Sequence, residues 1–245
     1  MKKTPFIISG IALLGFIFFM TGVMTGAKWI QHFDDYWNSI IRVGITNTKT
    51  TVISYLTDIG GVATICILTA VIVVIFVVIR KVDMAIWFGG IVLIGGALIP
   101  SIIKNIVQRP RPTYKLIEQG GFSFPSGHST GSTVFYGMLA FLLILYVSRR
   151  WLRFTIGILA FGLVIFIMYS RVYLGVHFPS DVVAGFLIGN AALFSGIGCY
   201  FIWNQKLALW ASRFKKHRKK SSLSKREDFL LSMFVSFAKN FQVSR

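Results

Sequence analysis

Two polar stretches of this otherwise apolar chain carry side chains that could act together on a phosphate group. The first holds Lys104, Arg111 and Pro125–His128, and the second holds Ser170, Arg171, His177 and Asp181. Imidazole titrates near neutral pH and can serve as a nucleophile or as a proton donor. Guanidinium and ammonium groups bind phosphate oxygens, the first as a planar fork and the second as a point charge. These residue types therefore suit the cleavage of a phosphate ester.

The spacing of His177 and Asp181 predicts a nucleophile and its orienting carboxylate. The two residues flank Phe178-Pro179-Ser180, and proline favours the first turn of a helix. Across that turn, Asp181 could hold one imidazole nitrogen, leave the other free to attack and stabilise the imidazolium that develops. His128 is then the candidate that protonates the departing oxygen, a contribution typically worth about 10²–10⁴-fold in rate.

Three cations and one helix start are candidates to bind the phosphate. Lys104, Arg111 and Arg171 lie at or just beyond the ends of apolar segments, where a charge is costly unless it meets water or an anion. Pro125-Ser126-Gly127 precedes such a segment, so unpaired backbone N–H groups, the Ser126 hydroxyl and the open space at Gly127 would form an anion cradle. Each feature alone has an ordinary explanation, such as a snorkelling arginine, a turn or a hydrogen-bonded histidine. Their combination favours a single site.

The elements that position these residues are predicted from long apolar segments. The chain has 245 residues, of which 55% are hydrophobic and 14% are charged, whereas soluble domains carry about 25% charged residues. A helix spans a bilayer with about 20 apolar residues, and roughly 17 suffice. Six segments without Lys, Arg, Asp or Glu meet this length: Thr4–Ala27, Ile59–Ile79, Met84–Ile103, Ser129–Ser148, Phe154–Ser170 and Val182–Gln205. They lack the alternation of a β-barrel, so we predict an all-α, polytopic membrane protein with six transmembrane helices.

The first two segments leave alternatives open. The second helix could begin as early as Val52, which would place Asp58 near its end. Lys2 and Lys3 precede the first segment, as in a signal peptide. However, this segment is longer than the usual apolar region of about 7–15 residues, and it lacks a clear cleavage site. We therefore expect a retained transmembrane helix.

Positive charges predict the orientation of the six helices. Eleven Lys and Arg residues follow Gln205, two lie at the N-terminus and five lie in the hairpins at 80–81 and 149–153, whereas eight lie on the opposite side. Cytoplasmic loops carry the excess of positive charge, so both termini are expected to be cytoplasmic in a multi-pass plasma-membrane protein. Without the tail the two counts are seven and eight, and the orientation then rests on the two short basic hairpins. The two polar stretches would leave the membrane together on the extracytoplasmic face.

The net charge of +18 is concentrated in the tail at 206–245. A basic segment beside a membrane is explained by anionic lipid headgroups, and no nucleic-acid motif accompanies it, so nucleic acid is not an expected partner. The stretch Phe229–Phe241 is amphipathic and fits a helix on the cytoplasmic leaflet as well as it fits disorder.

Trp29–Ile45 mixes aromatic and charged residues, as in a helix lying at the membrane interface or a loop at headgroup level. Cys66 and Cys199 fall inside apolar segments and suggest neither a disulfide nor a metal site.

At the motif residues the sequence resembles the type 2 phosphatidic acid phosphatase family, within the superfamily that includes the vanadium haloperoxidases. The family pattern is Lys, six residues and Arg-Pro, then Pro-Ser-Gly-His, then Ser-Arg, five residues, His, three residues and Asp. This chain matches every position: Lys104, Arg111-Pro112, Pro125–His128, Ser170-Arg171, His177 and Asp181. The resemblance implies an acid phosphatase/vanadium haloperoxidase-like helical core, with a six-helix phosphatase domain at 1–205 followed by a basic cytoplasmic tail at 206–245.

The resemblance also implies a role for each motif residue. His177 would form a phosphohistidine with Asp181 orienting it, and His128 would be the acid for the leaving group and then the base that activates water. The phosphoryl oxygens would be held by Lys104, Arg111, Ser126, Gly127, His128 and Arg171. The family works without a metal or other cofactor, and the motif loops of this chain hold no cluster of carboxylates for magnesium.

The expected function is that of an integral membrane lipid phosphatase acting on a lipid phosphate monoester or pyrophosphate. Candidate substrates are undecaprenyl pyrophosphate, phosphatidylglycerophosphate, phosphatidic acid and diacylglycerol pyrophosphate. The loops are too short for a separate substrate domain, so a lipid would enter laterally between helices. Three alternatives are a phosphotransferase with a lipid or sugar acceptor, a vanadate-binding peroxidase, whose relatives are generally soluble, and a non-enzymatic receptor or transporter. The last would not require the pair of His177 and Asp181.

Overall fold

Six helical segments between residues 3 and 218 are long and apolar enough to cross a membrane, as the sequence predicted. They are Thr4–Met24, Asn47–Val78, Val82–Val107, Gly127–Tyr146, Arg150–Tyr173 and Pro179–Asn204. The computed structural model describes residues 3–218, with side chains as far as Asn204, and this part is helical and contains no strand. The amphipathic stretch predicted at Phe229–Phe241 lies outside the described residues.

The described elements follow one another in a simple order. They are α1 (Thr4–Met24), α2 (Lys28–Ile41), α3 (Asn47–Leu56), a 3₁₀ turn η1 (Thr57–Gly60), α4 (Val62–Val78), α5 (Val82–Ile91), a π-helical segment η2 (Val92–Leu98), α6 (Ile99–Val107), α7 (Gly127–Tyr146), α8 (Arg150–Tyr173) and α9 (Pro179–Arg218). Elements α3 to α4 form the second candidate span, and α5 to α6 form the third.

The second, third, fifth and sixth segments are longer than the sequence predicted, and the second and sixth differ most. The second begins at Asn47, where the Thr46 side chain caps α3 by accepting a hydrogen bond from the backbone N–H of Lys49, and Asp58 lies in the turn η1. Helix α9 continues to Arg218, past the predicted end of the span at Gln205. The absence of charge marks where a segment can lie in hydrocarbon. It does not mark the helix ends, because polar residues, lysine and arginine also fit into helices.

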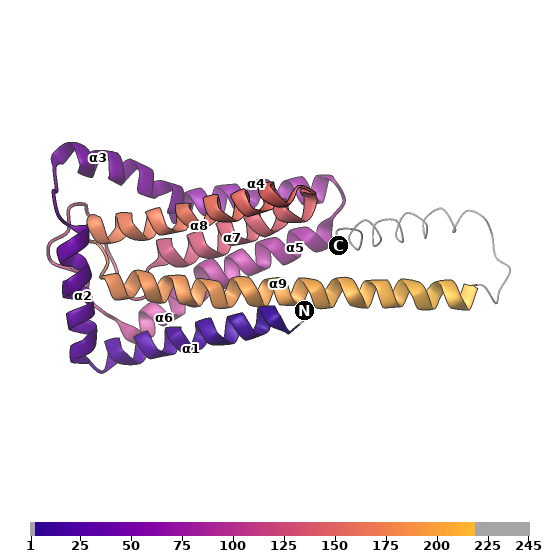
Figure 1. Cartoon of the computed structure of the whole chain (residues 1–245), viewed down its shortest axis with the longest axis horizontal. Helices are drawn as coiled ribbons and strands as arrows, with labels where there is room; N and C mark the ends of the chain where they lie inside the picture. Colours follow the sequence, from indigo (N-terminus) through magenta and orange to yellow (C-terminus); the bar gives the residue numbers. More distant parts are fainter. Residues whose placement is uncertain (1–2, 219–245) are drawn as a thin grey trace.

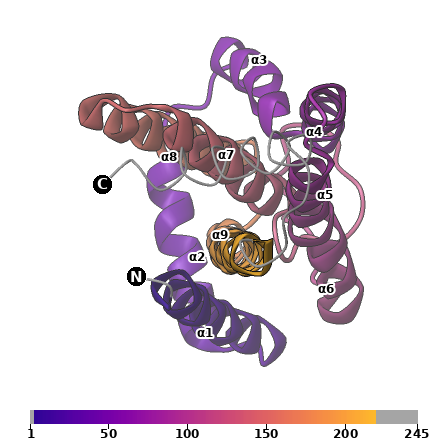
Figure 2. The same ribbon diagram turned by 90° about the vertical axis from the view of Figure 1, so that its right-hand side faces the viewer.

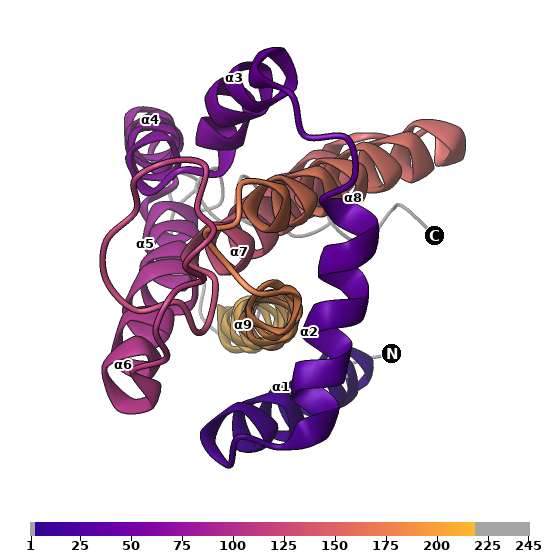
Figure 3. The same cartoon turned by 90° about the vertical axis from the view of Figure 1, so that its left-hand side faces the viewer.

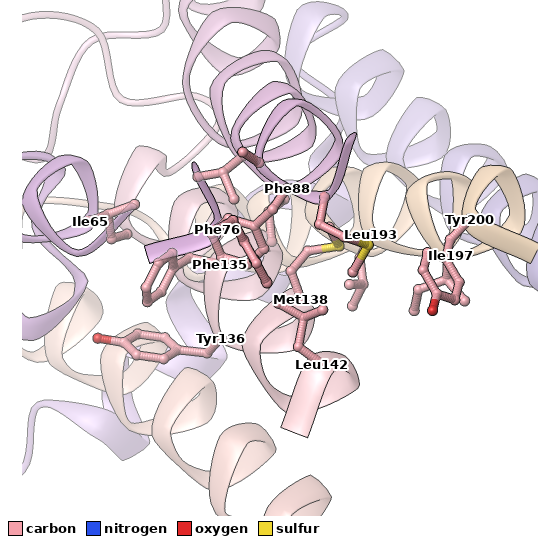
Figure 4. Packing of buried hydrophobic residues seen from close by; sticks show 14 of the residues in the cluster. Ile65, Phe76, Phe88, Phe135, Tyr136, Met138, Leu142, Leu193, Ile197 and Tyr200 are labelled. Atoms are coloured by element: carbon pink, nitrogen blue, oxygen red, sulfur yellow. The ribbon is translucent and has the colours of Figure 1, made fainter. Parts of the chain in front are cut away.

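Helix α7 lies at the centre of the bundle and is the most buried of the six segments. Phe88 of α5, Phe135 and Met138 of α7 and Leu193 of α9 belong to one cluster of buried side chains (Figure 4). The rings of Phe88 and Phe135 meet edge to face, with their centroids 6.0 Å apart. In a membrane, close packing of this kind drives helices together, so the cluster fixes the position of α7 between its neighbours.

Small residues let α9 approach α7 closely near one end of the bundle. Gly185 and Gly189 lie one turn apart on α9. A Cβ added at Gly185 would lie 2.7 Å from the carbonyl oxygen of Ser126, and one at Gly189 would lie 2.8 Å from Cβ of Thr133. Small residues four apart are typical of close helix contacts in membranes. Because Ser126 directly precedes α7, this contact sets the distance between the starts of α7 and α9.

Helix α1 packs along α9 (Figure 2), although its partner lies far away in the sequence. The Ser9 hydroxyl donates a hydrogen bond to the carbonyl of Ala191 at 2.8 Å, across a separation of 182 residues. It also lies 2.8 Å from the hydroxyl of Ser195. The first span is therefore held mainly by the last one.

One end of the bundle gathers α2, the loop between α6 and α7, and the turn between α8 and α9 (Figure 3). Helix α2 runs across this end rather than along the bundle, while the turns between α4 and α5 and between α7 and α8 lie at the other end (Figure 1). The segment Trp29–Ile45 is thus mostly a helix, the first of the two structures considered for it. Both polar stretches of the sequence reach the same end.

Candidate active site

The turn before α9 places His177 beside Asp181. Helix α8 ends at Tyr173, the chain reverses through Gly175 at φ +66°, and Pro179 begins α9. The Asp181 carboxylate accepts a hydrogen bond from the backbone N–H of Phe178 at 2.9 Å, and its Oδ2 lies 3.5 Å from Nδ1 of His177. That distance is longer than a hydrogen bond, and catalytic hydrogen bonds often tighten only when substrate binds. Both side chains are almost completely buried.

The start of α7 lies directly against the start of α9. Ser126 is the N-cap of α7, and its hydroxyl accepts a hydrogen bond from the backbone N–H of Ser129 at 3.3 Å. The backbone N–H of Ser126 donates to the carbonyl of Asp181 at 3.0 Å. Gly127 leaves open space, because a Cβ there would meet only the Lys104 side chain, at 4.0 Å. Two helix N-termini, each a positive dipole end, therefore meet at one place.

Three predicted phosphate-binding cations converge on this place, and one short loop segment holds all of them. Lys104 Nζ donates to the carbonyl of Phe122 at 2.7 Å. Arg111 Nε donates to the carbonyls of Gly120 and Gly121, each at 3.0 Å. Arg171 Nη2 donates to Oε1 of Gln119 at 2.8 Å. The segment 119–123 between α6 and α7 thus fixes where the positive charges lie, although no motif of the sequence indicated this.

The two histidines face the cations. Nη1 of Arg111 lies 3.1 Å from Nε2 of His177, so the ring nitrogen turned away from Asp181 is turned toward the positive charges. His128 is close enough to interact electrostatically with His177 and with the cations Lys104, Arg111 and Arg171. The structure therefore brings together all eight residues predicted for the site: Lys104, Arg111, Ser126, Gly127, His128, Arg171, His177 and Asp181.

The surroundings of the turn favour the neutral form of the His177 ring. Burial lowers the pKa of His177 well below its usual range, and the positive charges of Arg111, Arg171 and Lys104 lower it further. A neutral imidazole has a free lone pair, which is the form that can attack phosphorus. The surrounding positive charge both disfavours the protonated ring and suits an anionic group beside it.

Two residues that the sequence did not single out also belong to this cluster. Arg109 Nη1 donates to Oδ1 of Asp181 at 2.6 Å, and Arg109 Nη2 donates to Oδ2 of Asp34 at 2.7 Å. Burial opposes the charge of Arg109, but the two carboxylates outweigh it and raise the pKa of Arg109 above its usual value. The guanidinium also lies 4.0 Å above the ring of Phe178. Arg109 lies two residues before Arg111, but Asp34 lies on α2, and nothing in its local sequence connects it to the motifs.

Metal-binding donors do not gather at this place. Among the residues that the structure describes, no group of three His, Cys, Asp or Glu side chains is arranged to hold a metal ion. The Asp181 carboxylate, which lies beside His177, is bound by Arg109, and Arg109 also binds Asp34. The charged groups that act on the His177 ring are the cations Arg111, Arg171 and Lys104, which suit an anion.

Comparisons with known proteins agree with this arrangement. A family model described as PAP2 superfamily matches residues 85–206. The chain is 35% identical over 101 residues to phosphatidylglycerophosphatase B of Bacillus subtilis, which covers 40% of this chain and 49% of that protein. It is 38% identical over 84 residues to an undecaprenyl-diphosphatase of Sulfolobus acidocaldarius, which covers 32% of this chain and 34% of that protein. The chain thus spans half or less of the length of these curated relatives.

A solved structure has the same fold. The crystal structure of the first transmembrane PAP2 type phosphatidylglycerolphosphate phosphatase from Bacillus subtilis superposes with a TM-score of 0.68 at 25% sequence identity. The match covers 78% of this chain and 94% of that chain. The predicted all-helical membrane fold is confirmed by this neighbour.

Proposed function

Because residues 85–206 of this chain form a PAP2 superfamily domain, we propose that the protein is an integral membrane lipid phosphatase whose nucleophile is His177. One observation carries the proposal. The buried His177 ring has Nδ1 3.5 Å from Asp181 and Nε2 3.1 Å from Nη1 of Arg111, and its surroundings lower its pKa. A phosphate bound among Lys104, Arg111 and Arg171 would meet that nitrogen.

The reaction would proceed in two displacements at phosphorus. In the first, Nε2 of His177 forms a bond to phosphorus while the bond to the leaving oxygen breaks. His128, which takes up a proton when the charged phosphate binds beside it, gives that proton to the leaving oxygen. Asp181 stabilises the positive charge that develops on the His177 ring. In the second, His128 takes a proton from water as the water oxygen attacks phosphorus, which breaks the bond to nitrogen and releases inorganic phosphate.

The cations would stabilise the transition state of both displacements. The phosphoryl oxygens carry spread negative charge as the reaction proceeds, and fixed donors aimed at such charge are usually the largest single contribution to catalysis. Nη1 of Arg111 lies 3.1 Å from Nε2 of His177. Binding of a phosphate would redirect that donor to a phosphate oxygen and free the lone pair of the ring.

The substrates are proposed to be lipid phosphates with an extracytoplasmic headgroup. The curated relatives are named for phosphatidylglycerophosphate and for undecaprenyl diphosphate, so a monoester and a pyrophosphate are both candidates, with phosphatidic acid beside them. No metal is required in this mechanism, because arginine and lysine side chains supply the positive charge.

The test is release of inorganic phosphate from these lipids by the purified protein in detergent with EDTA present. The wild-type protein and His32→Ala should release phosphate, because His32 is exposed on α2. His177→Ala should lose at least about 10³-fold in rate, as expected for a missing nucleophile. A phosphoenzyme that is labile to acid and stable to base should form on the wild-type protein only. Full activity of His177→Ala would contradict the mechanism, and product with an added alcohol acceptor in place of free phosphate would indicate a transferase.

A further inference from the structure

A buried ion-pair chain continues behind His177, from Asp181 through Arg109 to Asp34. Arg109 bridges the two carboxylates with separate nitrogens, Nη1 to Asp181 at 2.6 Å and Nη2 to Asp34 at 2.7 Å. The exposed fractions of the three side chains are 0% for Asp181, 15% for Arg109 and 4% for Asp34. Charges this buried interact strongly, because solvent screens them little.

Both terminal nitrogens of Arg109 donate hydrogen bonds within this chain of contacts. Its Nη1 also donates to the Ser180 hydroxyl at 2.8 Å, and its guanidinium covers the ring of Phe178. Arg109 binds Oδ1 of Asp181, whereas Oδ2 is the oxygen that lies beside His177. Arg109 therefore acts on the carboxylate rather than on the substrate.

Asp34 offsets the positive charge that Arg109 brings to Asp181. Asp181 must remain negative toward His177, because it has to stabilise the positive charge that develops on the ring. A lone guanidinium at 2.6 Å would neutralise that carboxylate and draw it toward itself. With Asp34 bound to its other nitrogen, Arg109 is shared, and the three groups together keep one net negative charge behind the ring.

Asp34 also fixes the geometry of the turn that carries His177. Its Oδ1 accepts from the backbone N–H of Ser180 at 2.7 Å, and its Oδ2 accepts from the Ser180 hydroxyl at 2.9 Å. A carboxylate of α2 thus caps the first turn of α9, where the positive end of the helix dipole favours a negative charge. The chain of contacts runs from α2, through Arg109 of the loop after α6, to the turn of His177 and Asp181.

We propose that Asp34 and Arg109 are positioning residues of the reaction: they hold Asp181 against His177 and keep its negative charge available to the ring. The inference rests on the proposed function, in which His177 is the nucleophile. Their side-chain hydrogen bonds run to Asp181, to Ser180 and to each other, and neither residue is among those proposed to hold the phosphate. Their loss should therefore lower the rate of the chemical step and leave substrate binding largely unchanged.

The experiment compares Asp34→Asn with Asp35→Asn in phosphate release by the purified protein. Asp35 is the adjacent carboxylate of α2 and is exposed, so it controls for charge on the same helix. Asp34→Asn should lower kcat by roughly 10- to 100-fold, as for a displaced catalytic group, with KM within about threefold of wild type, whereas Asp35→Asn should change neither. The inhibition constant of vanadate, which adopts the geometry of the transition state, should rise in parallel with the fall in kcat.

A second pair of variants tests the shared guanidinium. Arg109→Gln leaves two buried carboxylates without a cation, and adding Asp34→Asn removes one of them. If the two substitutions acted independently, their fold losses in kcat would multiply. The double variant should instead lose about 10-fold less kcat than that product, which is within the range of couplings between contacting residues. Arg109→Lys should retain more activity than Arg109→Gln, and it serves in place of Asp34→Asn if that variant does not fold.

Failure of the inference differs from failure of the proposed function. If the wild type releases phosphate and Asp34→Asn has the kcat of Asp35→Asn, the positioning role is wrong. If Asp34→Asn melts earlier but keeps kcat for each folded molecule, Asp34 only caps α9, and the inference is again overturned. If the wild type releases no phosphate from any lipid, the proposed function fails. Vanadate binding then remains as the test, and equal affinity in Asp34→Asn and wild type would overturn the positioning role.

Discussion

Substitution of Gly185 by alanine tests how sensitive the site is to the contact between α7 and α9. A Cβ at this position would lie 2.7 Å from the carbonyl oxygen of Ser126, whereas an ordinary contact is at least 3.4 Å. The backbone must therefore move by about 0.7 Å to accept it. The backbone N–H of Ser126 donates a hydrogen bond to the carbonyl of Asp181, and Ser126 lies two residues before His128. Because the movement pushes the start of α7 away from α9, it should separate His128 from His177.

The expected loss follows from that distance. A displacement of about 1 Å in a catalytic constellation can cost about 10²-fold in rate, so we expect kcat of Gly185→Ala to fall by roughly 10- to 100-fold. Insertion of a methyl group into a close-packed contact also destabilises by about 1–3 kcal/mol. Gly189→Ala meets a similar obstruction one turn further along α9, about 6 Å from Gly185. It should lose comparable stability with a smaller loss of kcat.

The assay is the initial rate of phosphate release in detergent, with thermal unfolding of each variant measured alongside. Gly162→Ala is the matched control, because Gly162 lies on α8 with no atom within 4 Å of an added Cβ. It should keep the wild-type kcat and be stabilised slightly, since alanine favours a helix over glycine. A kcat of Gly185→Ala within twofold of wild type would refute the argument that this contact sets the geometry of the site.

Three further predictions concern pH, metals and topology. Burial, Arg111 and the other nearby cations lower the pKa of His177 below the usual histidine value of 6.5. The ring should therefore become protonated only at a pH lower than 6.5. The acid limb of kcat/KM, corrected for ionisation of the substrate, should then fall below that pH, and Arg111→Gln should move it upward; a limb at pH 6.5 or above in the wild type would contradict this. Phosphate release should be unchanged by EDTA and by added magnesium, since cationic side chains supply the charge stabilisation, and strict dependence on magnesium would overturn the metal-free mechanism. In a variant without the two native cysteines, Glu118→Cys in the loop after α6 should react with a membrane-impermeant maleimide on intact cells and Arg150→Cys should not, whereas the reverse pattern would place the site in the cytoplasm.

The number of helices and the motif residues could be predicted from the sequence because each has a local signal. A run of about 20 residues without charge marks a span, and the spacing of His177 and Asp181 fits a single helical turn. The candidate phosphate-binding cations could be selected for the same reason, since charges at the ends of apolar segments are conspicuous. Each of these signals is carried by residues that lie close together in the sequence.

The parts that were missed depend on contacts between distant segments. Asp34 looks like one polar residue of an interfacial helix until Arg109 is placed beside it, 75 residues later. Gln119 to Ser123 hold the cations mainly through backbone carbonyls, which every residue has, so their sequence gives no signal. The π-helical segment η2 lies within a uniformly apolar span, and hydropathy does not distinguish it from an α-helix. Such features become visible only when the helices are packed.

The packing of α1 on α9 has a consequence for how the protein is made. Chains are synthesised from the N-terminus at roughly 5–20 residues per second, so Ala191 emerges about 10–40 s after Ser9, its partner 182 residues earlier. During that interval α1 is already made, but the surface that it covers on α9 does not yet exist. The turn of His177 and Asp181 opens the same last span. If synthesis stops before α9, the membrane-inserted chain has a first helix without its packing partner and a candidate site without the proposed nucleophile, His177. Completion of the last span supplies both.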